Sequence, residues 1–123
     1  MDYDQVLEAQ KRLEEKFPKM FSGKYGGLEI GPGWVSLVEL LCTYIQGHAD
    51  WEQKRNPDFQ QVTVEQIKEK FGTLRFYYSG GDEYVSGLVS LAEGMSAHIC
   101  EVCGNNGKLI KGSWLKTRCK EHE

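Results

Sequence analysis

Residues 100–122 read CEVCGNNGKLIKGSWLKTRCKEH, and their cysteines and histidine follow the spacing C-x2-C-x15-C-x2-H. Two ligands that are two residues apart can reach one metal ion from a tight turn, and a second such pair completes the tetrahedron that Zn²⁺ accepts. Gly104 directly follows Cys103, and a residue free to take positive φ lets backbone N–H groups point at sulfur. The sequence therefore predicts one structural Zn²⁺ per chain, bound by Cys100, Cys103, Cys119 and His122.

A redox C-x-x-C motif and a disulfide are the competing interpretations of these cysteines. The N-terminal residues MDYDQVLEAQKRLEEKF contain neither the basic nor the apolar segment of a secretory signal, so we expect a cytoplasmic protein with reduced thiols. The Gly-Asn-Asn-Gly run after Cys103 does not open a helix, as a thioredoxin-like motif would. His98 could compete as a ligand, and Cys42, on an apolar helix stripe, is expected to be a small buried side chain.

Length and composition are those of one folded domain. The chain has 123 residues, 40% of them hydrophobic, which is enough for one core and too many for a disordered chain. No apolar run approaches the roughly 18 to 20 residues that span a bilayer, so we expect no membrane partner. The net charge of −3 disfavours a general polyanion binder. The basic residues of the C-terminal quarter are Lys108, Lys111, Lys116, Arg118 and Lys120.

Apolar periodicity predicts three helices, over residues 4–17, 34–46 and 82–98. The first has Val6, Leu13 and Phe17 on one face and ends at Pro18. In the second, apolar side chains recur at helical spacing, and Gly47 is expected to end it before a polar loop over residues 47–60. The apolar stripe of this second helix consists of Trp34, Leu37, Val38, Leu41, Cys42 and Ile45.

The third helix begins with Asp82 as its N-cap. Its apolar face is expected to point to the core and consists of Val85, Leu88, Leu91, Ala92, Met95 and Ile99.

Alternation of apolar residues predicts a strand over residues 73–78, with Leu74, Phe76 and Tyr78 on one face. Residues 61–70 fit either a strand or a short capped helix, and we favour a strand that pairs with 73–79 around Phe71-Gly72. A short strand is expected at 28–30, inside the glycine-rich loop 18–33.

Residues 108–111 and 113–117 are expected to form a two-stranded ribbon turned at Gly112, as in zinc-ribbon or treble-clef-like modules. The predicted fold class is α+β: three helices, a small antiparallel sheet and a C-terminal zinc module. We expect residues 1–99 to form the α+β core and residues 100–123 the zinc module, packed together as one compact domain.

Catalytic motifs are not recognisable, and we predict a protein that is not an enzyme. His48 and Asp50 form a His-x-Asp pair that could relay a proton, but without a third partner the pair is better interpreted as solvated loop residues. Basic and aromatic residues interleave around the predicted strand, and such a surface can pair with phosphate and stack on a base. The candidate ligand-binding residues there are Lys68, Arg75 and Tyr77.

Three segments carry a resemblance to a known family: IGPGWVSLVELLCTYI, QIKEKFGTLRFYYSGG and LAEGMSAHICEVCG. With the run KEKFGTLRFY at residues 68–77 and the final Cys/His set, the chain resembles a family of small bacteriophage- and prophage-encoded zinc-binding proteins over residues 17–122. The resemblance implies a phage accessory protein that works in the cytoplasm of the bacterial host.

In that setting the favoured hypothesis is a non-enzymatic counter-defence protein that binds and neutralises a host immune component. The partner would be a signalling nucleotide or a host defence protein, and a symmetric oligomer is compatible with either. The alternative is a nucleic-acid-binding accessory protein whose zinc ribbon and C-terminal lysines touch phosphates. An enzyme with an unfamiliar site around His48 and Asp50 ranks last.

Overall fold

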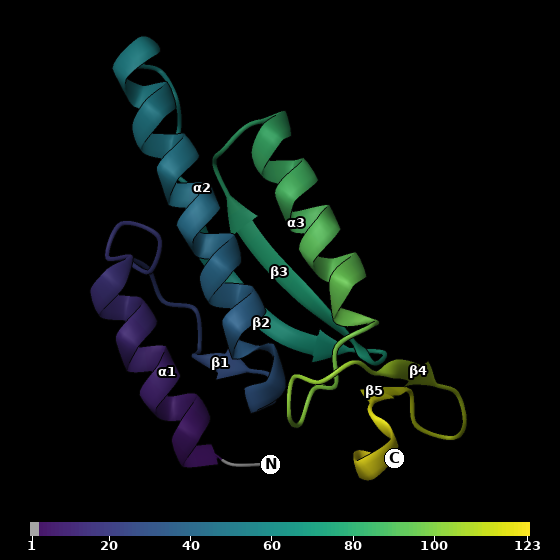
Figure 1. Ribbon diagram of the computed structural model, residues 1–123. Coiled ribbons are helices and arrows are strands. Elements are labelled where there is room, and N and C mark those ends of the chain that lie inside the picture. Colours follow the sequence, from purple (N-terminus) through teal and green to yellow (C-terminus); the bar gives the residue numbers. More distant parts are fainter. Residues whose placement is uncertain (1–2) are drawn as a thin grey trace.

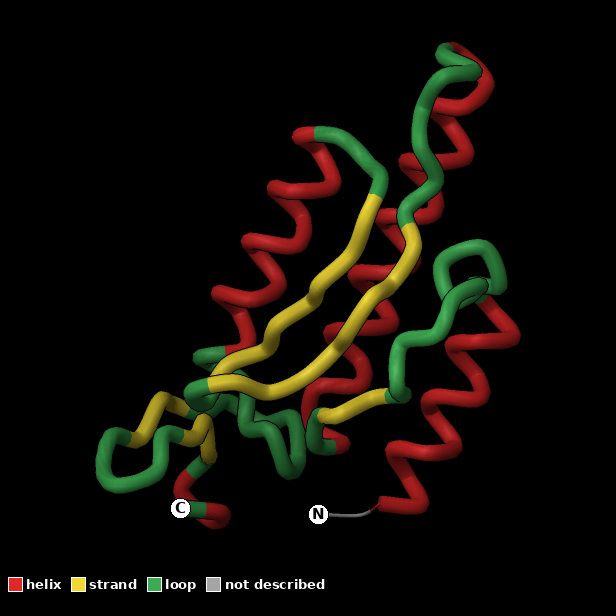
Figure 2. Tube along the Cα trace, turned by 180° about the vertical axis from the view of Figure 1, so that it is seen from behind, coloured by secondary structure: helices red, strands yellow, loops and turns green. Residues whose placement is uncertain are grey.

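The computed structural model describes residues 3–123. In chain order the elements are α1 (Tyr3–Lys16), β1 (Leu28–Glu29), the 3-10 helix η1 (Pro32–Trp34), α2 (Val35–Arg55), β2 (Thr63–Lys70), β3 (Thr73–Ser79), α3 (Glu83–Ser96), β4 (Lys108–Ile110), β5 (Lys116–Arg118) and η2 (Lys120–His122). α2 and α3 lie side by side on one face of the main sheet, and α1 lies beside α2 and β1 (Figure 1). Within the described residues, no helix crosses the opposite face of that sheet (Figure 2).

The main sheet has the strand order β1–β2–β3, and β4 and β5 form a separate hairpin. β2 and β3 are antiparallel, which confirms the strand that was favoured for residues 61–70. β1 pairs with β2 in parallel, with Leu28 opposite Ile67, so the main sheet is mixed rather than purely antiparallel. The parallel pairing follows from α2, because a helical crossover returns the chain to the sheet in its original direction. Three helices and a small sheet confirm the α+β class.

One hydrophobic core joins the helices to the sheet. The predicted apolar stripe of the second helix is buried along its whole length, from Trp34 to Ile45. Trp34 itself belongs to η1, and the α-helix begins one residue later. Cys42 lies inside this core, as expected, and burial raises the pKa of its thiol to about 12.

Gly47 does not end the second helix, so the prediction of a loop from this residue was wrong: α2 continues to Arg55. Packing stabilises the turn of α2 that follows Gly47. Ala49 is fully buried, and His48 contacts the start of α3. The Nε2 atom of His48 lies 2.8 Å from Asp82 Oδ2, and its ring stacks on Tyr84 at 4.2 Å. These contacts outweigh the roughly 1 kcal/mol that a glycine costs inside a helix.

α3 buries only part of the predicted apolar face: Val85 and Ala92 lie in the core, and Leu88 and Ile99 pack against it. Asp82 caps the helix as expected, its Oδ1 accepting the Val85 N–H at 3.1 Å. Leu91 and Met95, however, are 63% and 40% exposed. The sheet is met by smaller side chains, which let the helix approach the strands closely, and Ser96 Oγ accepts a backbone N–H of β3 at 2.9 Å. The buried residues of α3 are Val85, Val89, Ala92 and Ser96.

The C-terminal hairpin is shorter than predicted. β4 and β5 pair over three residues each, and residues 111–115 connect them, so the turn is not made by Gly112 alone. A Cβ added to Gly112 would meet nothing within 4 Å, which means that no close approach demands glycine there.

The turn between β2 and β3 has positive φ at both central residues, 54° at Phe71 and 86° at Gly72. A type I′ turn requires this combination, and asparagine is the preferred residue at its first position. Glycine suits the second position because of its positive φ and because a Cβ on Gly72 would lie 3.0 Å from the backbone nitrogen of Lys116. Phe71 therefore holds a left-handed conformation that costs a side-chain-bearing residue about 1 kcal/mol or more.

Replacing Phe71 by asparagine is expected to stabilise the protein by about 0.5 to 1 kcal/mol, which corresponds to a rise of a few degrees in Tm. Phe71 is 64% exposed, so little burial is lost. Phe71→Ala is the matched control, because it removes the ring and keeps the strain. Thermal unfolding of both variants decides the point, and equal Tm values for the two would contradict the explanation.

Candidate metal centre

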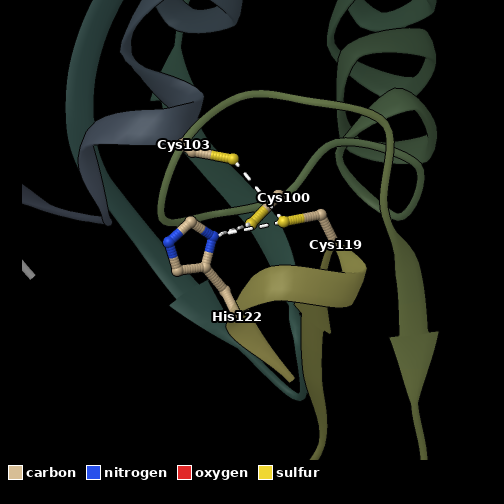
Figure 3. Close-up of side chains that lie close together, drawn as sticks. All are labelled: Cys100, Cys103, Cys119 and His122. Atoms are coloured by element: carbon tan, nitrogen blue, oxygen red, sulfur yellow. Dashed lines mark hydrogen bonds between the residues drawn. The ribbon is translucent and has the colours of Figure 1, made fainter.

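The four predicted metal ligands come together at the C-terminal end of the chain (Figure 3). One ligand atom from each of them lies within 4.8 Å of every other. The Cys103 and Cys119 sulfurs are 3.7 Å apart, and His122 Nδ1 lies 3.2 Å from the Cys119 sulfur. The four residues could therefore hold one metal ion. An ion bound by all four would have a complete tetrahedral shell with no open position for a substrate.

Two short backbone turns present the ligands. The first follows α3, where Gly104 N–H donates to the Cys100 carbonyl at 2.9 Å and Gly104 takes a φ of 84°. The second is η2, where His122 N–H donates to the Cys119 carbonyl at 3.1 Å. Each turn brings the two residues of one C-x2-C or C-x2-H pair to the same side, which is the reason for the two-residue spacing in the sequence.

Backbone N–H groups prepare Cys100 for metal binding. Burial disfavours its thiolate, but three backbone N–H groups donate to its sulfur and together lower its pKa to about 6. The lowered pKa favours the thiolate, which is the form that binds metals. The donors are the N–H groups of Cys119, Cys103 and Val102.

The pKa of Cys103 shifts in the opposite direction from that of Cys100. The N–H of Asn105 lowers its pKa, but partial desolvation and the neighbouring sulfurs of Cys119 and Cys100 raise it further, so the net shift is upward. A metal cation would remove this repulsion between adjacent sulfurs, and metal binding would release the remaining thiol proton.

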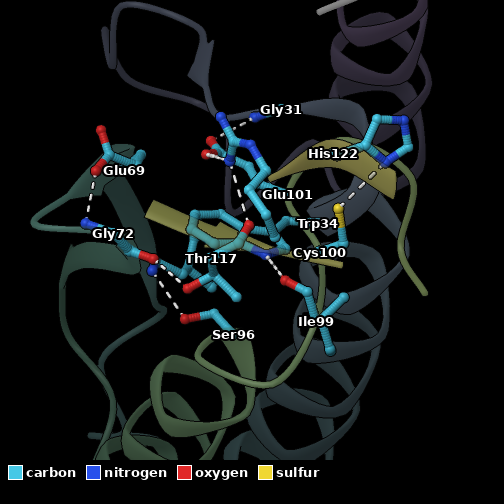
Figure 4. Close-up of polar contacts among 12 residues, drawn as sticks. Gly31, Trp34, Glu69, Gly72, Ser96, Ile99, Cys100, Glu101, Thr117 and His122 are labelled. Carbon is cyan, nitrogen blue, oxygen red and sulfur yellow. Dashed lines mark hydrogen bonds and ion pairs between the residues drawn. The ribbon is translucent and has the colours of Figure 1, made fainter. Parts of the chain in front are cut away.

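Hydrogen bonds to backbone carbonyls of the first turn attach it to η1, and Figure 4 shows the one from Trp34. Gly33 N–H donates to the Glu101 carbonyl at 2.7 Å, and the indole Nε1–H of the fully buried Trp34 donates to the Ile99 carbonyl at 2.7 Å. A Cβ on Gly33 would lie 2.1 Å from the Cys100 carbonyl oxygen, so only glycine fits. Sequence analysis treated the Gly-Pro-Gly-Trp segment, residues 31–34, as a connecting loop. In the structure it binds and positions the first turn of the candidate metal centre.

Glu101, between the first two cysteines, is 4% exposed and links three parts of the chain. Its carboxylate accepts the Gly31 N–H at 2.9 Å and lies 3.3 Å from Arg118 Nη1. Burial raises the pKa of this carboxyl, although both of these contacts act in the other direction. Sequence analysis missed Glu101, because nothing local distinguishes it from the solvated glutamates elsewhere in the chain.

The β2–β3 turn contacts the same region. Thr117 is fully buried, and its hydroxyl donates to the Gly72 carbonyl at 2.6 Å. Its own carbonyl accepts the Glu101 N–H at 3.1 Å. The candidate metal centre is therefore joined both to η1 and to the end of the main sheet.

The candidate ligand residues lie elsewhere, on the sheet face that no described helix covers. Lys68 is opposite Arg75 in the β2–β3 register, and Tyr77 is opposite Gln66. Since alternate residues of a strand share a face, Arg75 and Tyr77 lie on the same side. The Nε atom of Arg75 is buried and has no hydrogen-bond partner within residues 3–123.

The other candidate residues named from the sequence do not come together in one site. His48 pairs with Asp82 rather than with Asp50, whose Oδ1 lies 3.7 Å from Lys19 Nζ. His98 is exposed and is not one of the clustered ligands. Among the C-terminal basic residues, Arg118 is tied to Glu101, whereas three lysines are exposed: Lys108, Lys111 and Lys120.

No protein-family model, characterised protein or solved structure matches the chain. The fold and the ligand cluster therefore carry the functional argument by themselves. Within residues 3–123 no helix combines the length and apolar character needed to cross a membrane.

Cys103→Ser is expected to abolish metal binding and to lower Tm by more than about 10 °C. Cys103 is exposed, so the exchange of sulfur for oxygen creates no cavity, and any loss of stability reports the metal. Asn105→Ser, at a neighbouring exposed position, is the control and should keep both metal and Tm. Elemental analysis and thermal unfolding measure the two effects. A metal-free Cys103→Ser variant that melts like the unmodified protein would show that the metal does not stabilise the fold.

Proposed function

We propose that the protein is a non-enzymatic counter-defence protein that binds and neutralises a host immune signal, and that this signal is an anionic nucleotide. The resemblance to small phage and prophage proteins supports the setting, a bacterial host cell. The observation that carries the ligand class is Arg75, whose Nε is buried without a hydrogen-bond partner on the uncovered face of the main sheet.

Two cations and an aromatic ring share that face. Lys68 of β2 and Arg75 of β3 are cross-strand partners. Tyr77, 40% exposed, follows Arg75 by two residues, which places the two side chains about 7 Å apart along the strand. The sheet is seen from this side in Figure 2, where the strands lie in front of the helices.

The chemistry of this face suits a phosphorylated base. A buried N–H without an acceptor costs about 1 to 3 kcal/mol. A phosphate bound at the guanidinium would supply the acceptor once the atoms that cover Nε move aside. The Arg75 guanidinium can bind phosphate through two parallel hydrogen bonds, while Lys68 adds a second positive charge. The Tyr77 ring offers a stacking surface, worth about 1 to 3 kcal/mol per base.

We also propose that the metal is a structural Zn²⁺, one per chain. Tetrahedral coordination at about 2.3 Å from zinc to sulfur sets two sulfurs about 3.8 Å apart. The separation of 3.7 Å between the Cys103 and Cys119 sulfurs agrees with this value. Three thiolates and one imidazole form a donor set that favours zinc among the common divalent ions.

The protein purified from bacterial cells is expected to carry one zinc atom per chain. Elemental analysis of protein produced in medium with equal concentrations of zinc, iron, nickel and copper measures this, with Cys103→Ser as the metal-free control. Iron or copper in place of zinc, or much less than one atom per chain, would contradict the assignment.

Nucleotide binding is expected to depend on the open sheet face. Arg75→Ala and Tyr77→Ala should each weaken binding at least about tenfold without lowering Tm, because each removes one contact to the ligand. Lys108→Ala, which removes an exposed positive charge from β4, is the control and should bind normally. Native mass spectrometry of the purified protein reports any bound nucleotide, and calorimetry with mono- and cyclic dinucleotides gives the affinities.

Full binding by both sheet variants would place the ligand elsewhere. A protein that binds no nucleotide, but binds nucleic acid with an affinity that falls steeply with salt, would support the nucleic-acid alternative instead.

A further inference from the structure

α2 and α3 lie on the side of the main sheet that is turned toward the viewer in Figure 1. Side chains of these two helices line an apolar groove. It has a volume of about 270 Å³, and no segment within residues 3–123 fills it. A single exposed apolar residue is ordinary in a soluble protein, whereas a contiguous set marks an interaction surface. The large side chains of the groove that are 40 to 63% exposed are Leu40, Tyr44, Tyr84, Leu91 and Met95.

Charge is absent from this surface. Residues 40–47 of α2 include no charged side chain, and residues 84–96 of α3 include only Glu93. The Glu93 carboxylate is turned toward the sheet, where it accepts the Phe76 N–H at 2.9 Å. The exposed residues of these two segments that do not line the groove are small and neutral: Thr43, Gly47, Ser86, Gly87, Ser90 and Gly94.

Three of those small residues are glycines inside helices. Gly47 lies one turn beyond Tyr44, and Gly87 and Gly94 lie one turn on either side of Leu91. A Cβ built on any of them would meet no atom within 4 Å, so nothing within the chain requires glycine. Glycine nevertheless destabilises a helix relative to alanine. Close approach of a second backbone is a physical reason to have it there.

We propose that this α2–α3 face is the interface of a symmetric homodimer, in which the same face of a second copy covers the groove. A two-fold axis sets a patch against itself, so a residue on the axis meets its own copy and a patch with charges of one sign repels itself. This face avoids that repulsion because it is uncharged, although the chain as a whole carries −3. Its leucines, methionine and tyrosines fill the two facing grooves, and its glycines let the helices approach.

The available area suits a stable dimer. Such interfaces bury about 800 Å² per partner, about a tenth of the surface of a small protein, and this chain exposes 7385 Å² in all. Tyr44 and Tyr84, at a little over half exposed, offer on the order of 200 Å² between them. Leu40, Leu91 and Met95 extend this area along both helices, over the length of α3.

Sedimentation equilibrium of the full, metal-loaded chain tests the proposal. The expected result is a dimer mass at concentrations between about 10 µM and 1 mM. Leu91→Glu should raise the dissociation constant about 100-fold or more, because each interface would bury two unpaired carboxylates. Trp114→Glu is the matched control: it adds the same charge at a side chain that is 74% exposed in the β4–β5 loop, and it should leave the dimer intact.

Gly94→Leu tests close approach without adding charge. The position is open in the single chain, so the variant should fold normally and form a weaker dimer, while Gly112→Leu, at an equally open position of the β4–β5 loop, should not affect it. A chain that is monomeric over the whole concentration range would overturn the proposal. A dimer that withstands both Leu91→Glu and Gly94→Leu would overturn it as well, because the copies would then meet through another surface.

Discussion

The packing of the 99–104 turn against η1 is the constraint on which the C-terminal half depends. The contact is made by backbone, because Gly33 leaves no room for a side chain beside the Cys100 carbonyl. Trp34 adds a hydrogen bond from deep inside the core to the Ile99 carbonyl. These bonds position the turn from outside the ligand cluster, so Cys100 and Cys103 of the candidate metal centre belong to a segment that the main fold already orients.

The metal-ligand cluster could be predicted because the spacing of its two pairs is a local property of the sequence. The contacts that anchor it could not, since Glu101 and Gly31 are 70 residues apart and neither belongs to a pattern. The buried faces of the helices also differ in how far the sequence predicts them. The stripe of α2 contains all the large apolar residues of its core side, whereas α3 has two apolar faces at helical spacing. The face with the smaller side chains, which include Val89 and Ala92, packs against the sheet. Periodicity alone cannot tell which of the two faces will be buried.

The main sheet separates two surfaces of opposite character. One side presents Lys68, Arg75 and Tyr77, and the other side is covered by α2 and α3, whose shared groove is lined by no charged residue. The proposed dimer contact and the proposed nucleotide face thus lie on opposite sides of each copy. Pairing through the helices would leave both sheets free, and each dimer would carry two outward-facing ligand sites that do not compete with assembly.

The hydrogen bond from Trp34 to Ile99 also sets an order for biosynthesis. Trp34 is synthesised 65 residues before Ile99, whose carbonyl accepts its indole hydrogen bond. This bond can therefore form only after a late segment of the chain has been made. A chain whose translation stops before residue 99 would lack the cysteine turn that packs against η1. Its Trp34 indole would have no Ile99 carbonyl to bind. Cellular proteases act on such incompletely closed chains. The arrival of the cysteine segment would therefore separate finished molecules from those destined for degradation.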